Sequence, residues 1–81
     1  MAETDYRERI VVDPRIMMGK PVIAGTRITV EHILRELGGG MSVEELLAAY
    51  PQLTEEDVRA AQAYAAEWMA SEKSIPLEPA G

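Results

Sequence analysis

The chain has 81 residues, no cysteine, a net charge of −6 and an apolar fraction of 47%. This length fits one domain and excludes a two-lobed enzyme, and the absence of cysteine excludes disulfides and thiolate zinc sites. No apolar run is as long as a signal sequence or a membrane span, so we expect a cytoplasmic protein without a membrane partner.

Charge is unevenly distributed along the chain. Residues 1–35 contain six basic and five acidic side chains, net +1, whereas residues 36–81 contain two basic and nine acidic side chains, net −7. A polyanion such as DNA is therefore expected to bind to the N-terminal part, and a basic protein to the C-terminal part.

The first part of the chain is expected to be extended. Residues 1–8 are polar and mixed in charge, which predicts a flexible arm. Residues 9–28 predict a hairpin-like unit: the run "RIVVDP" is a short strand stopped by Asp-Pro, and "KPVIAG" is an edge strand because proline cannot donate to a ladder. Gly19 and Gly25 are expected to supply turns with positive φ.

Residues 29–70 show helical periodicity and predict three helices. Apolar residues spaced as i, i+3, i+4, i+7 begin after Thr29, a helix cap, and end at the glycines 38–40. A second helix begins at Ser42 and stops at Pro51, and a third begins after Thr54. Residues 71–81 contain two prolines and predict a flexible tail.

These elements predict a mainly α fold with a small N-terminal β element. The second and third helices, joined by a short turn, have the lengths of a helix-turn-helix. We therefore expect one homeodomain-like domain of three helices over residues 9–70.

The stretch "GKPVIAGTRITV" resembles a phosphate-binding loop only superficially. A P-loop places its lysine after the second glycine, whereas Lys20 follows the first, which argues against a nucleotide site. Arg15, Lys20 and Arg27 are nevertheless candidates for contacts to nucleic acid along one side of the hairpin. The alternative is that they form surface ion pairs with carboxylates of the helical part.

Catalytic and metal-binding arrangements are not evident. His32 is the only histidine, and the carboxylates at 44, 45 and 55–57 lie where they favour helix N-termini. Those at 55–57 would repel DNA phosphates at the start of the third helix. We therefore expect no catalytic residue, no metal and no cofactor.

Tyr64, Trp68 and Met69 of the third helix are candidates for a partner-binding surface. Tryptophan and tyrosine are enriched at protein interfaces. In a chain that lacks phenylalanine, the single tryptophan is also a candidate for the core.

The chain resembles the bacterial family called domain of unknown function 433 from about Ile10 to Ala66. The resemblance rests on "IVVDPRIMMGKPVIAGTRITVEHIL" followed by "GMSVEELLAAYPQLTEEDVRAAQAYA". It implies a small helix-turn-helix-like domain, often a homodimer. Some members look like antitoxins encoded beside PIN-type toxins and repress their own promoters.

Two functions are consistent with this reading. The first is a non-enzymatic, antitoxin-like binding module whose partner is a PIN-type nuclease, because the acidic helical part fits a basic partner. The alternative is a DNA-binding transcriptional regulator that uses Lys20 and Arg27 of the β element.

Overall fold

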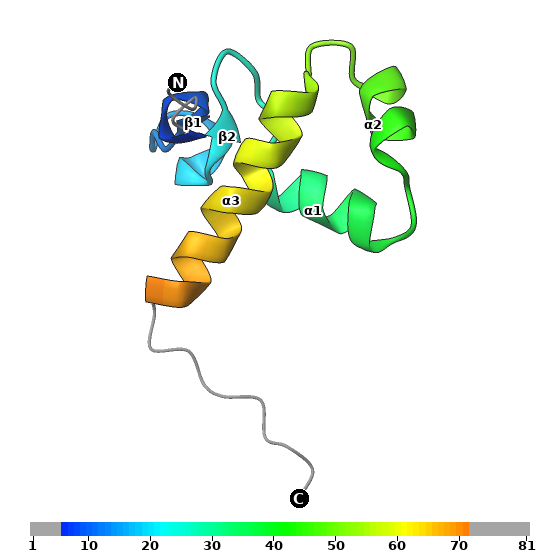
Figure 1. Ribbon diagram of the computed structural model, residues 1–81. Helices are drawn as coiled ribbons and strands as arrows, with labels where there is room; N and C mark the ends of the chain where they lie inside the picture. Colours follow the sequence, from blue (N-terminus) through cyan, green and yellow to red (C-terminus); the bar gives the residue numbers. More distant parts are fainter. Residues whose placement is uncertain (1–5, 72–81) are drawn as a thin grey trace, which may run out of the picture.

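The computed structural model describes residues 6–71, which form a mainly helical fold (Figure 1). This confirms the fold class predicted from the sequence. In chain order the elements are η1 (Tyr6–Arg9), β1 (Ile10–Val11), η2 (Met17–Gly19), β2 (Val22–Ile23), α1 (Val30–Gly38), α2 (Val43–Ala49) and α3 (Glu55–Ser71), where η denotes a 3-10 helix.

Strands β1 and β2 form the small N-terminal sheet. They pair antiparallel, with Ile10 opposite Ile23 and Val11 opposite Val22. The strands are shorter than the apolar runs that predict them, because Asp-Pro follows the first strand closely and Pro21 immediately precedes the second.

The connection between the strands and the loop after β2 contain backbone conformations that the sequence only partly indicates. Gly19 and Gly25 have φ of +87° and +81°, as predicted. Met17 and Met18 also have positive φ, 49° and 58°. Non-glycine residues enter this region only at a cost, and neither methionine gives a local signal for it.

The expected arm does not include residues 6–8. These residues form η1 together with Arg9, and η1 packs along α3. Arg7 Nη2 lies 3.2 Å from Glu67 Oε2, and Arg9 Nη1 lies 2.9 Å from Asp57 Oδ1. The contacts that order this segment come from residues far along the chain, so its polar composition gave no sign of them. The rest of the arm, residues 1–5, lies outside the described residues.

The three helices begin where the capping signals predict. Thr29 Oγ1 accepts a hydrogen bond from a backbone N–H of the first turn of α1. Ser42 and Glu45 form a reciprocal capping box at α2. Thr54 and Asp57 do the same at α3, each side chain accepting a hydrogen bond from the other's backbone N–H. Ser71, assigned to the tail, is the last residue of α3, and residues 72–81 lie outside the described residues.

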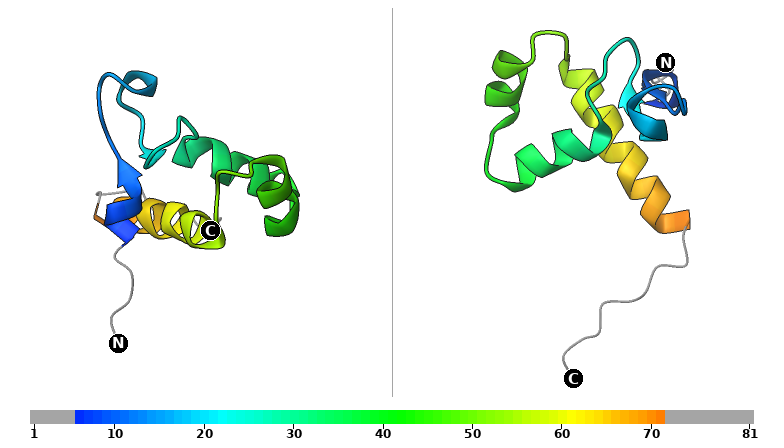
Figure 2. Two further views of the ribbon diagram at one scale, coloured as in Figure 1. Left: turned by 90° about the horizontal axis from the view of Figure 1, so that it is seen from above. Right: turned by 180° about the vertical axis from the view of Figure 1, so that it is seen from behind.

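Helix α3 is the element that holds the fold together. In views from the front and from behind it passes between the β hairpin on one side and α1 with α2 on the other (Figures 1 and 2). The core lies where these elements meet and consists of Ile23, Val30, Ile33, Leu46, Leu53, Val58 and Ala61. The helix continues past this core, and every residue from Ala66 to Ala70 is exposed.

Candidate functional site

An apolar groove lies between α1 and the C-terminal part of α3, and we call it the α1–α3 groove. Its volume is about 560 Å³, within the range of roughly 300–1,000 Å³ that binding pockets occupy. Its apolar lining includes Pro21, Val30, Leu34, Tyr64, Trp68 and Met69.

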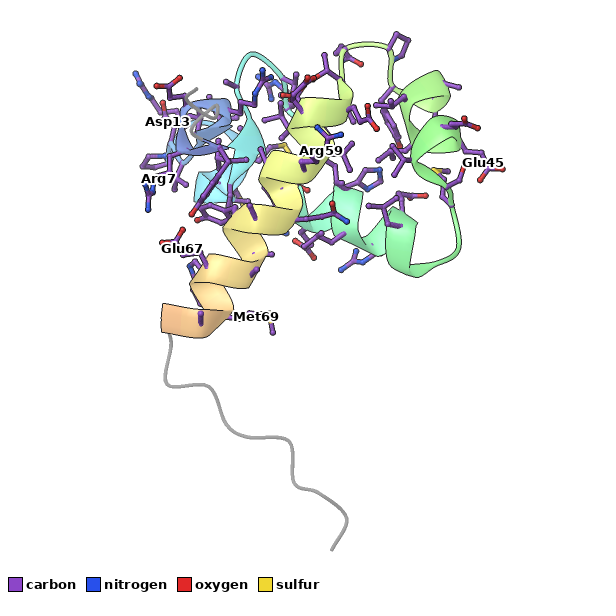
Figure 3. The ribbon with its side chains drawn as sticks, viewed as in Figure 1. Arg7, Asp13, Glu45, Arg59, Glu67 and Met69 are labelled. Atoms are coloured by element: carbon purple, nitrogen blue, oxygen red, sulfur yellow. The ribbon has the colours of Figure 1, made fainter. Side chains whose placement is uncertain are left out.

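The three residues predicted to bind a partner all line this groove. Tyr64 is half-buried and packs against the core, whereas Trp68 is 55% exposed and Met69 is 63% exposed. Figure 3 shows Met69 at the end of α3 that projects beyond the other elements. Within residues 6–71, Trp68 is therefore not a core residue, because the elements beside this part of α3 leave more than half of it exposed.

Charged side chains form one rim of the α1–α3 groove. Lys20 Nζ lies 2.9 Å from Glu31 Oε1, and Arg35 Nη2 lies 2.6 Å from Glu31 Oε2. The hydrogen bond and charge of Lys20, with the charge of Arg35, hold the pKa of Glu31 below its usual range. Glu31 and Arg35 line the groove, and Lys20 pairs with Glu31 from beside the lining, so these three side chains together carry one net positive charge.

Arg15 is paired within its own turn. Its guanidinium donates to both carboxylate oxygens of Asp13, at 3.1 and 3.0 Å, and its backbone N–H donates to the same side chain. These hydrogen bonds hold the pKa of Asp13 below its usual range, and the pKa of Arg15 is raised.

Arg27 has a different environment. It is exposed and forms no ion pair with any residue in the range 6–71. It lines a second hollow together with Thr26 of the loop between β2 and α1 and Gln52 of the turn between α2 and α3. The three basic candidates thus have separate neighbours: Asp13 for Arg15, Glu31 for Lys20, and Gln52 for Arg27.

The first turn of α3 has a structural role that the sequence analysis anticipated. Asp57 is buried and caps the helix, while Glu55 and Glu56 are exposed. His32 Nε2 lies 2.7 Å from Tyr50 Oη, and this contact connects α1 to the turn before α3.

Within residues 6–71, no three His, Cys, Asp or Glu side chains are grouped as metal ligands. None of the helices in that range is long and apolar enough to span a membrane.

Some residues of the two surfaces were not singled out from the sequence. Leu34 was part of the apolar stripe of its helix, and nothing local shows that it faces a groove. Pro21, Arg35 and Gln52 reach their positions only through the packing of separate elements. These residues are far from Trp68 and Arg27 in sequence or show no local pattern, so the sequence alone did not indicate that they line the same surfaces.

Comparisons with known proteins agree on one family. The profile of the family described as "Protein of unknown function (DUF433)" matches residues 10–65. Trp68 and Met69 lie beyond this matched segment.

Two curated proteins are similar in sequence. Uncharacterized protein y4eO of Sinorhizobium fredii is 41% identical over 59 residues, which cover 73% of this chain and 27% of that protein. An uncharacterized protein of Archaeoglobus fulgidus is 61% identical over 28 residues, covering 35% of this chain and 78% of that protein. The chain thus spans about a quarter of the length of y4eO.

A solved structure is also similar. The crystal structure of a DUF433 member protein from Anabaena variabilis superposes with a TM-score of 0.71 at 37% identity, covering 73% of this chain and 58% of that one. Since the family profile also covers most of the residues, from the first strand into α3, this chain belongs to the DUF433 family.

Proposed function

We propose that this chain is a non-enzymatic, antitoxin-like binding module whose partner is a small nuclease-like protein of the PIN type. The observation that carries the proposal is the α1–α3 groove, in which Trp68 and Met69 are 55% and 63% exposed. Large apolar side chains gathered beside a pocket are typical of protein interfaces, where tryptophan and tyrosine are enriched among the few residues that contribute most of the binding free energy.

Charge outside the α1–α3 groove supports a basic partner. Residues 36–81 have a net charge of −7, and the exposed carboxylates of Glu44, Glu45, Glu55 and Glu56 lie on α2 and at the start of α3. Figure 3 shows Glu45 on the outer side of α2. A nuclease binds a polyanion, which favours basic side chains around its site, and complementary charge accelerates association and favours the correct partner.

The test is direct binding of the full chain to a purified PIN-type nuclease encoded beside it. We expect a complex by calorimetry and inhibition of RNA cleavage. Replacing Trp68 by Ala removes a central anchor and is expected to weaken binding by about 2 kcal/mol, roughly 30-fold. Met69→Ala is expected to weaken it less.

The matched control for Met69→Ala is Met18→Ala. Met18 is 87% exposed and does not line the α1–α3 groove, so its replacement removes the same side chain from a different surface. We expect it to leave the affinity unchanged. Absence of binding, or equal affinities for Trp68→Ala and the unmodified chain, would overturn the proposal.

A second candidate function, DNA binding, is favoured by Arg27. This side chain is exposed, and it lies beside Gln52 of the helix-turn-helix rather than beside a carboxylate. The acidic first turn of α3 disfavours the usual approach of a recognition helix, so contacts to phosphate would come from the loop before α1.

For this candidate we expect Arg27→Ala to weaken DNA binding and to lower the slope of log K against log salt by about one. Lys20→Ala is expected to act in the same direction, and Arg59→Ala, on α3, serves as the arginine control. A homodimer would present two copies of Arg27 to two half-sites, and sedimentation of the full chain checks for it. Equal affinity and salt slope for Arg27→Ala and the unmodified chain would exclude this form of DNA binding.

A further inference from the structure

The α1–α3 groove lies at the end of α3, and the sequence continues from there with the segment "EKSIPLEPAG", residues 72–81. Within it, Ile75 and Leu77 flank Pro76, and Pro79 follows three residues after Pro76. Ile75 and Leu77 are the bulky aliphatic residues of the segment, and both come within ten residues of the exposed Trp68.

We propose that residues 75–79, Ile-Pro-Leu-Glu-Pro, occupy the α1–α3 groove of the same chain. Prolines at i and i+3 lie on one face of a polyproline II helix, which has three residues per turn. Segments of this P-x-x-P type dock into grooves lined by aromatic side chains, and their preformed geometry keeps the entropic cost low. Tyr64 and Trp68 provide such a lining.

The lengths involved permit this contact. Tyr64 and Trp68 are four residues apart on α3, about 6 Å along the helix axis. A polyproline II segment advances about 3.1 Å per residue, so residues 75–79 span the distance between the two rings. Residues 72–74 leave about 10 Å of chain for the reversal after α3.

Charge and proximity select this occupant. Glu78 is the acidic residue among residues 75–79, and Lys20, Glu31 and Arg35 beside the groove together carry one net positive charge. A short connection gives an effective concentration on the order of 1 mM. A second copy of the chain at micromolar concentration therefore competes poorly for the same groove. Occupancy by the segment also lowers the apparent affinity for any partner that uses Trp68.

Trp68 is the only tryptophan, so its fluorescence reports directly on the groove. The experiment compares the full chain with the double variant Ile75→Asp, Leu77→Asp by emission maximum and acrylamide quenching. The control is Ser74→Asp, Ala80→Asp, which adds the same charge to the segment and keeps residues 75–79. We expect the first variant, but not the control, to show a red shift and a quenching constant raised about twofold, because burial of an aromatic ring restricts the quencher.

Two further measurements make the result decisive. A synthetic peptide of residues 72–81, added at millimolar concentration to the Ile75→Asp, Leu77→Asp variant, is expected to restore the shielding of Trp68. Circular dichroism is expected to show the same helix content in all chains, since no residue of α1, α2 or α3 is substituted.

Equal quenching in the two variants, or no effect of the peptide, would overturn the inference. Shielding of Trp68 that increases with protein concentration would also overturn it, because a second copy would then fill the groove. None of these measurements uses a nuclease. The inference can therefore fail or succeed separately from the proposed function.

Discussion

Asp57 shows how one side chain can serve two parts of this fold. One carboxylate oxygen accepts the backbone N–H of Thr54 at 3.0 Å, closing the cap of α3, and the other lies 2.9 Å from Arg9 Nη1. The spacing of Thr54 and Asp57 predicts the cap. The contact to Arg9 joins residues 48 positions apart and has no sequence signal.

Replacing Asp57 by Ala is therefore expected to cost more than the loss of a cap alone. A helix cap contributes about 1 kcal/mol and a hydrogen bond between charged groups about 1.5–3 kcal/mol, so we expect the free energy of unfolding to fall by about 2–4 kcal/mol. Urea denaturation measures this change. Glu56→Ala, the exposed neighbour in the same turn, is the control and is expected to change stability by less than about 0.5 kcal/mol. Similar losses for both variants would contradict the double role of Asp57.

At the scale of elements, glycine is required in a loop or at a helix end only where the backbone has a positive φ. Gly25, between β2 and α1, has a φ of +81°, whereas Gly38 is the last residue of α1 and lies outside the positive-φ region. A Cβ at either position would meet no heavy atom within 4 Å. The two sites therefore differ in backbone conformation and not in available space.

The same substitution is consequently expected to have opposite effects at the two positions. Gly25→Ala places a Cβ in a left-handed conformation and is expected to destabilise the fold by about 1 kcal/mol. Gly38→Ala improves helix propensity and is expected to stabilise it by up to about 1 kcal/mol. Thermal unfolding of both variants beside the unmodified chain gives the two signs. A destabilised Gly38→Ala would show that the end of α1 needs glycine for another reason.

At the scale of the whole molecule, β2 separates the two candidate surfaces. Pro21, immediately before the strand, lines the α1–α3 groove, and Val22, the next residue, lines the hollow that contains Arg27. Successive residues of extended chain point to opposite sides, so one short segment contributes to both surfaces without joining them. Protein binding at the groove and DNA binding at Arg27 would therefore use different side chains, except for Lys20, which pairs with Glu31 beside the groove.

The sequence by itself determined the local features of this protein. The helix caps at Thr29, Ser42 and Thr54 and the positive φ at Gly19 and Gly25 follow from residues within a few positions of one another. Such features depend on backbone dihedrals and on hydrogen bonds within one turn, which neighbouring residues specify.

Only the tertiary structure decided which surfaces these elements expose. Three features depend on the packing of η1, α1 and the hairpin around α3. They are the helical conformation of residues 6–8, the pairing of both Lys20 and Arg35 with Glu31, and the exposure of Trp68. Helical periodicity identifies the apolar face of α3, but it does not say how far along the helix the other elements extend to cover that face. For this reason Tyr64, Trp68 and Met69 could be predicted as candidates from the sequence, but only the packing of α1 beside α3 shows that they line a groove.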